Sequence, residues 1–306
     1  MNLLHMKYVV TVADMGSINK AAEELLVAQP NVSRSIKELE ADLGISIFHR
    51  TSKGMTLTPE GAEFIGYARN ILHQIDEVEQ MYKEGAPAKQ TFSISVPRAS
   101  YIADAFARFS TKIGTGTAEL FYKETNALRA VRNILEADYH LGIIRYAENY
   151  DRQFKDMLAE KGLNCELVSE FRFVLIANRK STLAGLDEIH FQDLSDLIEI
   201  AHADPYVPSM PLSAVKREEL PDNVKRRIFV FERGSQFDLL ASNPETYMWV
   251  SPLPDILLDR YQLIQKPCVD NQRVYRDLLI YRKDYHLSSL DKMFITEMCE
   301  SKRRYL

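Results

Sequence analysis

The sequence predicts an α/β protein with a small helical N-terminal domain, a long connecting helix and a larger region made of two similar α/β halves. Three observations predict this fold class. Apolar residues recur at helical spacing through residues 1–46 and are followed by two short strand patterns. A heptad stripe occupies residues 64–82, and strand and helix patterns alternate from residue 90 and restart near residue 165.

The composition indicates a globular protein with more than one hydrophobic core. The chain has 306 residues, of which 46% are hydrophobic and 26% charged, and single cores rarely grow beyond about 250 residues. No apolar run approaches the roughly 18 residues that span a bilayer. The first residues lack the features of a signal peptide, so we expect a cytoplasmic protein. Cys165, Cys268 and Cys299 lie far apart and predict neither a disulfide nor a zinc site, and no cofactor is expected.

The first domain is predicted to contain two helices joined by a tight turn. Ser17 is placed to cap the first of them, and residues 26–28 are too few for anything but a turn. The next helix begins at Gln29, with Pro30 in its first turn, where a missing N–H is tolerated. Such a pair is the layout of a helix-turn-helix, whose second helix enters the major groove of DNA.

The second helix of this pair divides into an apolar and a polar face. Val32, Ile36 and Leu39 recur at helical spacing and are expected to face the core. The polar face carries the candidate DNA-binding residues Gln29, Pro30, Ser33, Arg34 and Lys37. In the major groove Gln pairs with adenine, and Arg or Lys with guanine. The alternative interpretation is an ordinary solvated helix face.

Two short strands are predicted next, in the segment IFHRTSKGMTLT at residues 47–58. They form the wing of a winged helix-turn-helix, and Arg50 and Lys53 near its tip are further candidates for contact with DNA. Residues 1–59 hold six lysines and arginines against six aspartates and glutamates, and the whole chain has a formal net charge of −5. Attraction to DNA therefore has to come from the placement of these cations.

Residues 17–61 resemble the DNA-binding domain of the LysR-type transcriptional regulators, a bacterial family. The segment SINKAAEELLVAQPNVSRSIKELEADLGISIFHRTSKGMTLTPEG is similar to the family's pattern of paired alanines, Gln-Pro, Ser-Arg, Leu-Gly and Leu-Thr-x-x-Gly. The resemblance implies that Gln29, Pro30, Ser33 and Arg34 read DNA and that Arg50 is the wing contact. Ala28 departs from the pattern, because the family usually has a serine there, and an N-cap hydroxyl is missing.

A long helix is predicted after residue 58, where Thr58 and Pro59 provide a cap and a first-turn proline. Its heptad stripe consists of Phe64, Ala68, Ile71, Ile75, Val78 and Tyr82. A partner helix would cover such a stripe, and the resemblance implies a dimerising linker helix here. The alternative is packing against the chain's own later domain. The sequence Gly-Ala-Pro-Ala at residues 85–88 ends the helix and marks a hinge.

Strand and helix patterns alternate after the hinge. TFSISV, AELFYKE and LIEIAHA predict strands, and helices are expected from about Ser100, Asn126 and Ser288. Such alternation predicts parallel sheets flanked by helices. The pattern restarts at CELVSEFRFVLIANRK. We therefore predict domains at 1–58, 59–89 and 90–306, with the last divided into subdomain I (about 90–164 and 267–306) and subdomain II (about 165–266).

The resemblance implies a periplasmic-binding-protein-like effector domain, with a pocket between its two subdomains. In open α/β sheets ligands bind beyond the carboxyl ends of the strands. The candidates at such positions are Arg98, Ser100, Thr125, Asn126, Arg145, His202, Asp204, Gly234 and Ser235. Their hydroxyls and arginines predict a small anion, such as a carboxylate, as the effector. Ser100, Thr125 and Ser235 have helix capping as an alternative role.

The leading interpretation is a sequence-specific transcriptional regulator and not an enzyme. By resemblance its partners are double-stranded DNA, a small-molecule effector, further copies of the chain in a homodimer or homotetramer, and RNA polymerase. One alternative is an enzyme that uses the α/β region, with the N-terminal unit serving assembly. The seven histidines, however, form no recognisable metal, triad or phosphate-loop motif. A solute-binding protein is a further alternative, but no export signal precedes residue 90.

Overall fold

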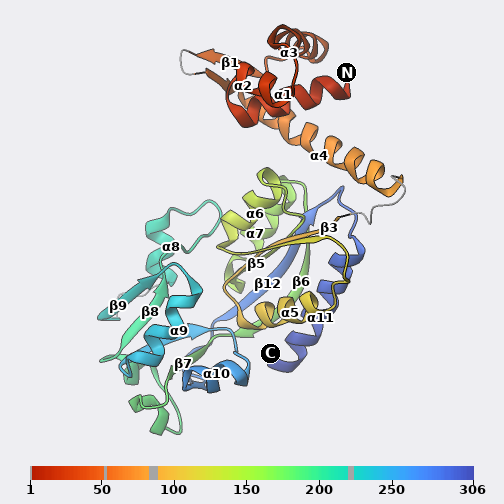
Figure 1. The fold of residues 1–306 in the computed structure, drawn as a ribbon. Coiled ribbons are helices and arrows are strands. Elements are labelled where there is room, and N and C mark those ends of the chain that lie inside the picture. The colour runs from red at the N-terminus through yellow and green to blue at the C-terminus, as the bar shows by residue number, and fades with distance from the viewer. Residues whose placement is uncertain (1, 52–53, 83–88, 220–223) are drawn as a thin grey trace. The chain divides into compact units, whose positions relative to one another are not determined.

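The computed structural model describes residues 2–51, 54–82, 89–219 and 224–306. The chain divides into two compact units, Met1–Ala88 and Lys89–Leu306 (Figure 1). Each unit has its own hydrophobic core. The predicted hinge at residues 85–88 lies outside the described residues.

The first unit contains three short helices, a two-stranded wing and the first part of a long helix. In chain order these are α1 (Leu3–Met15), α2 (Ile18–Glu24), α3 (Gln29–Leu43), β1 (Phe48–Thr51), β2 (Gly54–Leu57) and α4 (Pro59–Tyr82). Ser17 Oγ accepts a hydrogen bond from the Lys20 amide at 3.5 Å and so caps α2. Gly16 and Gly44 end α1 and α3 in the left-handed conformation, with φ of 61° and 69°. The predicted helix-turn-helix and wing are confirmed.

The wing is attached to the helices through its backbone. Glu40 of α3 accepts hydrogen bonds at Oε1 from the amides of Ile47 (2.7 Å) and Phe48 (3.2 Å), so this acid fixes the start of the wing. Gly54 has a φ of 126°, and a Cβ there would lie 2.5 Å from the carbonyl oxygen of Gly16. Only glycine fits this corner.

The long helix α4 contributes its first half to the core of the first unit. Thr58 Oγ1 accepts a hydrogen bond from the Gly61 amide at 2.8 Å, which confirms Thr58 at the start of the helix. Ala68 is fully buried and Phe64 packs on the core, because α1 lies against this part of α4. The rest of the predicted stripe consists of the half-buried Ile71 and Ile75, the 53% exposed Val78, and Tyr82, whose side chain is outside the described residues.

The second unit contains two five-stranded sheets, with the strand orders β4-β3-β5-β12-β6 and β11-β7-β10-β8-β9. The first sheet consists of β3 (Gln90–Val96), β4 (Ala118–Glu124), β5 (Leu141–Ala147), β6 (Leu163–Arg172) and β12 (Val274–Arg282). The second consists of β7 (Val174–Asn178), β8 (Ile198–His202), β9 (Arg226–Val230), β10 (Thr246–Val250) and β11 (Leu263–Lys266). Both sheets are mixed and not purely parallel as predicted. The strands that the chain enters on crossing between sheets, β7 and β12, run antiparallel to their neighbours.

The first crossing between the sheets lies at Phe173, later than the predicted boundary near residue 165. β6 stays in the first sheet through Arg172, and β7 begins the second sheet at Val174. The run CELVSEFRFVLIANRK contains no glycine or proline. Because nothing in this run marks a turn, the sequence gives no sign of where the crossing falls.

Helices cover both faces of the first sheet (Figure 1). On one face α5 (Ser100–Thr111) and α11 (Ser289–Tyr305) enclose Phe92, Phe109 and Phe294, whose ring centroids lie 4.7, 5.2 and 5.7 Å apart. α6 (Ala127–Glu136) and α7 (Asp151–Glu160) lie on the other face. The second sheet carries α9 (Arg233–Ser242) and α10 (Asp255–Tyr261). No helix in the described ranges has both the length and the apolar character needed to cross a membrane.

Candidate functional sites

The polar face of α3 lies at the surface of the first unit. Its residues line a shallow hollow together with Glu38: Gln29, Pro30, Ser33, Arg34 and Lys37. All except the half-buried Ser33 are exposed, whereas Val32, Ile36 and Leu39 are buried on the opposite side. The predicted division of the helix into a core face and a solvent face is confirmed. Contact between the solvent face and DNA stays a prediction.

The positive charge on this face is only weakly compensated. Arg34 Nε lies 3.5 Å from Glu38 Oε1, and the two side chains are 81% and 53% exposed. An exposed pair of this kind contributes less than about 1 kcal/mol, so Arg34 is free to take another partner. Ala28 is the N-cap of α3 and makes no side-chain hydrogen bond. The first amides of the helix therefore lack a side-chain cap, and such amides favour anions such as phosphate.

The predicted wing contacts are only partly placed. Lys53 lies outside the described residues, and of Arg50 only the backbone, in β1, is described. The face of α3 is therefore the part of the predicted DNA-binding site that the structure brings together.

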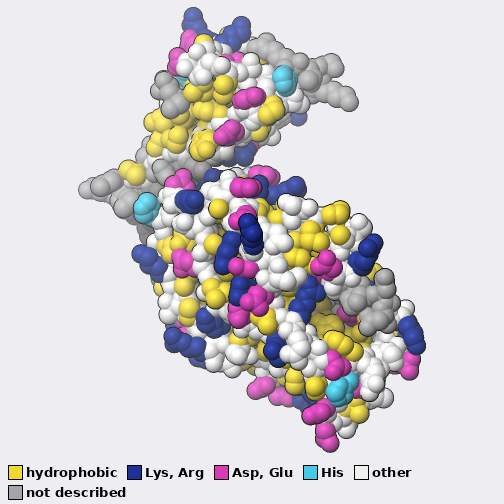
Figure 2. All heavy atoms as spheres, turned by 180° about the vertical axis from the view of Figure 1, so that it is seen from behind, with side chains coloured by type: hydrophobic (Ala, Val, Ile, Leu, Met, Phe, Trp, Pro, Cys, Tyr) yellow, Lys and Arg dark blue, Asp and Glu magenta, His cyan; other side chains and the backbone are white. Residues whose placement is uncertain are grey.

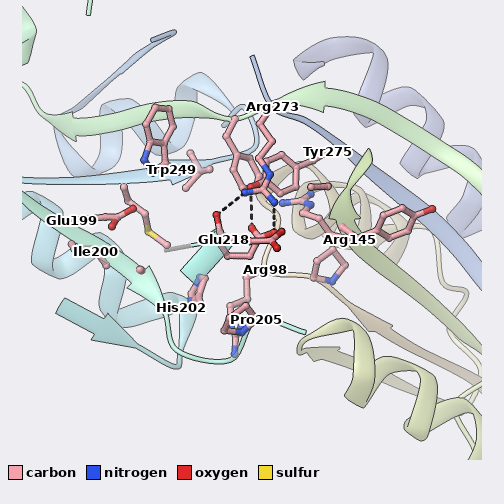
Figure 3. Close-up of a pocket in the computed structure, with 18 of the residues that line it drawn as sticks. Arg98, Arg145, Glu199, Ile200, His202, Pro205, Glu218, Trp249, Arg273 and Tyr275 are labelled. Atoms are coloured by element: carbon pink, nitrogen blue, oxygen red, sulfur yellow. Dashed lines mark hydrogen bonds and ion pairs between the residues drawn. The ribbon is translucent and has the colours of Figure 1, made fainter. Parts of the chain in front are cut away.

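A cavity of about 600 Å³ lies in the second unit between the two subdomains (Figure 3). Six of the predicted effector-binding residues line it: Arg98, Thr125, Asn126, Arg145, His202 and Asp204. They lie near or beyond the carboxyl ends of strands β3, β4, β5 and β8, the region where open α/β sheets bind ligands. We call this cavity the cleft.

The other three candidates are not among the described lining residues of the cleft. Ser100 is buried in the first turn of α5, where its hydroxyl accepts a hydrogen bond from Arg233 Nη2 at 2.8 Å. Gly234 and Ser235 lie in the first turn of α9. All three residues follow a strand in the sequence, but none of them is among the described lining residues of the cleft.

Helix capping does not explain the three hydroxyl residues Ser100, Thr125 and Ser235. The N-cap positions of the helices concerned are occupied by Ala99, Asn126 and Glu232. Of these, Asn126 caps with its side chain: its Oδ1 accepts a hydrogen bond from the Arg129 amide at 2.9 Å, and its Nδ2 donates to the carbonyl of Asp204 at 3.0 Å. Asn126 thereby joins the two subdomains across the cleft.

The two predicted arginines of the cleft are each held by a carboxylate. Arg98 donates from Nη1 and Nη2 to Asp204 at 3.0 and 3.3 Å. Arg145 donates from Nε and Nη2 to the fully buried Asp277 at 2.8 and 2.7 Å. The Tyr101 hydroxyl donates to the same carboxylate at 2.6 Å, and burial raises the pKa of Tyr101 well above its usual value. The expectation of a small anion was based on the hydroxyls and arginines together, and both of these arginines have a carboxylate partner.

His202 ends β8 and is uncharged at neutral pH. Its Nδ1 lies 3.2 Å from the carbonyl oxygen of Val230, so the neutral ring donates its proton there. Burial, with a smaller contribution from the positive charge of Arg98, lowers the pKa of His202 to about 4. The ring keeps Nε2 as a hydrogen-bond acceptor and adds no positive charge to the cleft.

Much of the cleft wall comes from residues that the sequence did not single out. Aromatic side chains supply a large part of it: Tyr146, Tyr150, Phe173, Phe191, Tyr206, Tyr247, Trp249 and Tyr275. Gln236 of α9 also lines the cleft and is only 3% exposed. Its Oε1 is buried, with no hydrogen-bond donor in reach among the residues described. No periodicity distinguishes a ring that lines a cavity from one that fills a core, which is why the sequence missed these residues.

One segment of the second subdomain reaches onto the first. This strap, residues 203–219, follows β8 and ends with α8 (Leu212–Glu219). Val207 and Val215, 2% and 1% exposed, are buried in the core formed by α6, α7 and the first sheet. At the end of the strap, Glu219 pairs with Arg273 at 2.6 Å and accepts a hydrogen bond from the Tyr275 hydroxyl at 3.2 Å. The strap thus forms one wall of the cleft and connects the two subdomains.

Charges of both signs are spread over the second unit. On the face drawn in Figure 2, Lys and Arg side chains are interspersed with Asp and Glu. Within the ranges that the structure covers, no group of three or more His, Cys, Asp and Glu side chains is placed to hold a metal ion.

Comparison with known proteins relates the first unit to bacterial regulators in sequence. Residues 3–62 match the family model described as bacterial regulatory helix-turn-helix protein, lysR family. The HTH-type transcriptional regulator BenM of Acinetobacter baylyi is 40% identical over 94 residues, which is 31% of this chain and 31% of BenM. The chain therefore matches less than a third of the length of this curated relative.

Solved structures resemble the chain over nearly its whole length. Full-length LysG from Corynebacterium glutamicum, with bound effector Arg, gives a TM-score of 0.63 at 16% identity and covers 100% of this chain and 99% of LysG. Full-length CbnR in complex with its target DNA gives a TM-score of 0.56 at 19% identity and covers 98% of this chain and 100% of CbnR. At these identities the likeness establishes the fold.

Proposed function

We propose that the chain is a LysR-type transcriptional regulator, a sequence-specific DNA-binding protein whose activity is modulated by a small molecule bound in the cleft. The sequence match to the family model is confined to residues 3–62. For the rest of the chain the proposal rests on the fold and on the two candidate sites.

The observation that carries the proposal is the exposed face of α3. It presents an amide, a hydroxyl and two cations on the solvent side of a helix whose other side is anchored in the core. A helix held in this way can enter the major groove, where Gln, Arg and Lys distinguish base pairs by their donor and acceptor patterns. The uncapped amides at its start are suited to a backbone phosphate.

The cleft supports modulation by a ligand. It lies between two subdomains that are joined by contacts across it, such as Arg98 with Asp204 and Arg273 with Glu219. A ligand changes the balance between two arrangements only when it binds them with different affinity. A ligand that contacts both subdomains binds two arrangements with different affinity when the distance between the subdomains differs between them.

We further propose that the regulator works as a homodimer or homotetramer and acts on RNA polymerase. Support for self-association comes from α4, where Ile71, Ile75 and Val78 continue a heptad stripe beyond the part that the first unit buries. Two copies of the helix-turn-helix would then bind two half-sites of one operator.

DNA binding by the chain tests this proposal. The binding is measured by fluorescence anisotropy with a labelled duplex taken from upstream of the chain's own coding region. Arg34→Ala is expected to weaken specific binding by about 1–3 kcal/mol if Arg34 reads a base. Arg152→Ala is the matched control, because Arg152 lies on α7 in the second unit and is 92% exposed. It should leave the isotherm unchanged.

Salt dependence provides an independent measurement of the same site. Lys37→Ala should reduce the slope of log affinity against log salt concentration by about one if Lys37 meets a phosphate. An isotherm unaffected by both Arg34→Ala and Lys37→Ala would exclude the α3 face as the DNA-binding site.

A further inference from the structure

The positive charges that line the cleft are already neutralised. Three described arginines line it, and each has its own carboxylate: Arg98 with Asp204 at 3.0 Å, Arg145 with Asp277 at 2.7 Å, and Arg273 with Glu219 at 2.6 Å. No lysine occurs among the described lining residues, and His202 is neutral. An anion that binds one of these arginines either displaces its carboxylate and leaves it uncompensated, or places a second negative charge beside a pair that is already neutral. Both are unfavourable in a largely buried place.

The walls of the cleft are suited to a ligand with an apolar body. Its volume of about 600 Å³ falls within the range of pockets that hold drug-sized molecules. Eight aromatic side chains line it, among them Phe173, Trp249 and Tyr275. Rings of this kind gain free energy by covering an apolar or aromatic surface and also attract organic cations. A small carboxylate would leave most of this surface uncovered.

One polar group of the wall lacks a partner. Gln236 is 3% exposed, and within the described part of the chain no donor reaches its Oε1. A buried acceptor left without a hydrogen bond is unfavourable, so a ligand that supplies an N–H or O–H gains both the bond and the removal of that defect.

We infer that the cleft takes an uncharged or cationic ligand with an apolar body and a hydrogen-bond donor for Gln236. The ligand is an effector only if the proposed function holds. The chemical class of the ligand is inferred from the residues that line the cleft, and it does not depend on DNA binding.

Three naphthalene derivatives substituted at the same ring position test this inference. Naphthalenemethanol is neutral and carries a donor, naphthylmethylammonium is a cation, and naphthoate is an anion, while all three bury the same ring system. In calorimetric titration of the full-length chain, the alcohol and the ammonium are expected to bind at least about tenfold more tightly than naphthoate. Equal or tighter binding of naphthoate overturns the inference, and so does the absence of binding by all three.

Two substitutions separate the roles of the acceptor and the paired arginines. Gln236→Leu should weaken binding of naphthalenemethanol by about fivefold, whereas Gln153→Leu, at an exposed position of α7, should not change it. Asp204→Asn releases Arg98 and should raise the affinity for naphthoate. If naphthoate affinity is the same in Asp204→Asn as in the native chain, the pairing of Arg98 does not exclude anions and the inference fails.

DNA binding distinguishes this failure from failure of the proposed function. A chain that binds its upstream DNA but prefers naphthoate remains a regulator, and only the ligand class is wrong. A chain that binds the alcohol and the ammonium but no DNA keeps the ligand class and loses the proposed function.

Discussion

Ala28 leaves the start of α3 without a side-chain cap. It has the extended backbone of an N-cap residue, with φ of −69° and ψ of 133°, but a methyl group where serine would have a hydroxyl. A serine at an N-cap accepts a hydrogen bond from an amide of the first turn and contributes about 1 kcal/mol relative to alanine. We expect Ala28→Ser to slow hydrogen exchange of the α3 amides in the full-length chain by about fivefold.

The control for this substitution lies on the same helix. Ala41 is exposed inside α3, where every amide already has a helical partner, so Ala41→Ser should speed exchange slightly because serine is the poorer helix former. Equal effects of the two substitutions would show that Ala28 is not the residue at which the helix begins.

Single residues also show which contacts the sequence does not predict. Arg145 was placed in the cleft from its position near the end of a predicted strand, and the structure brings it there. Its partner Asp277 lies 132 positions later in the chain, on β12. No local pattern connects the two, so the sequence did not reveal that this arginine is held in an ion pair.

At the scale of elements, the strap forms one wall of the cleft. Val215 fixes α8 on the core of the first subdomain, and Trp249, the only tryptophan of the chain, lines the same cleft. Val215→Asp places a carboxylate in an apolar cluster and should release the strap, because an unpaired buried charge is strongly unfavourable. We expect the acrylamide quenching constant of Trp249 to rise roughly twofold or more as this local opening exposes the ring.

Leu212→Asp is the matched control on the same helix. Leu212 is 53% exposed, so a carboxylate there stays in water and Trp249 quenching should not change. Circular dichroism of both variants establishes that the sheets are intact. If Val215→Asp keeps its fold and quenches like the native chain, the strap does not cover the cleft.

Elements were predicted well where local chemistry marks them. Ser17, Asn126 and Ser288 were expected at helix starts, and each accepts a hydrogen bond there from a backbone amide. The crossing at Phe173 and the strap were missed for the same reason: they are defined by contacts with distant segments. The antiparallel direction of β12 likewise depends on which sheet the chain returns to, which helical and strand periodicity do not encode.

At the scale of the whole molecule, we propose that copies of the chain associate through the remaining stripe of α4. α1 covers the start of the stripe. Ala68 is fully buried there, and Phe64 packs on the core of the first unit. Ile71 and Ile75 are half-buried and Val78 is 53% exposed, so the apolar surface that one chain leaves uncovered lies in the second half of the helix. A second copy of α4 would cover it in the manner of a short coiled coil.

Val78→Glu tests this association. In a pair of helices the substitution brings two like charges into an apolar seam, and we expect the dimer dissociation constant to rise by about tenfold or more in sedimentation velocity. Ala62→Glu is the control, because Ala62 is exposed in the first turn of α4, away from the second half of the helix. It should leave the dissociation constant unchanged. Two half-sites bound together give an affinity that one head does not reach. Val78→Glu should therefore also weaken operator binding while leaving the α3 face intact, and an unchanged sedimentation profile would place the self-association surface elsewhere in the chain.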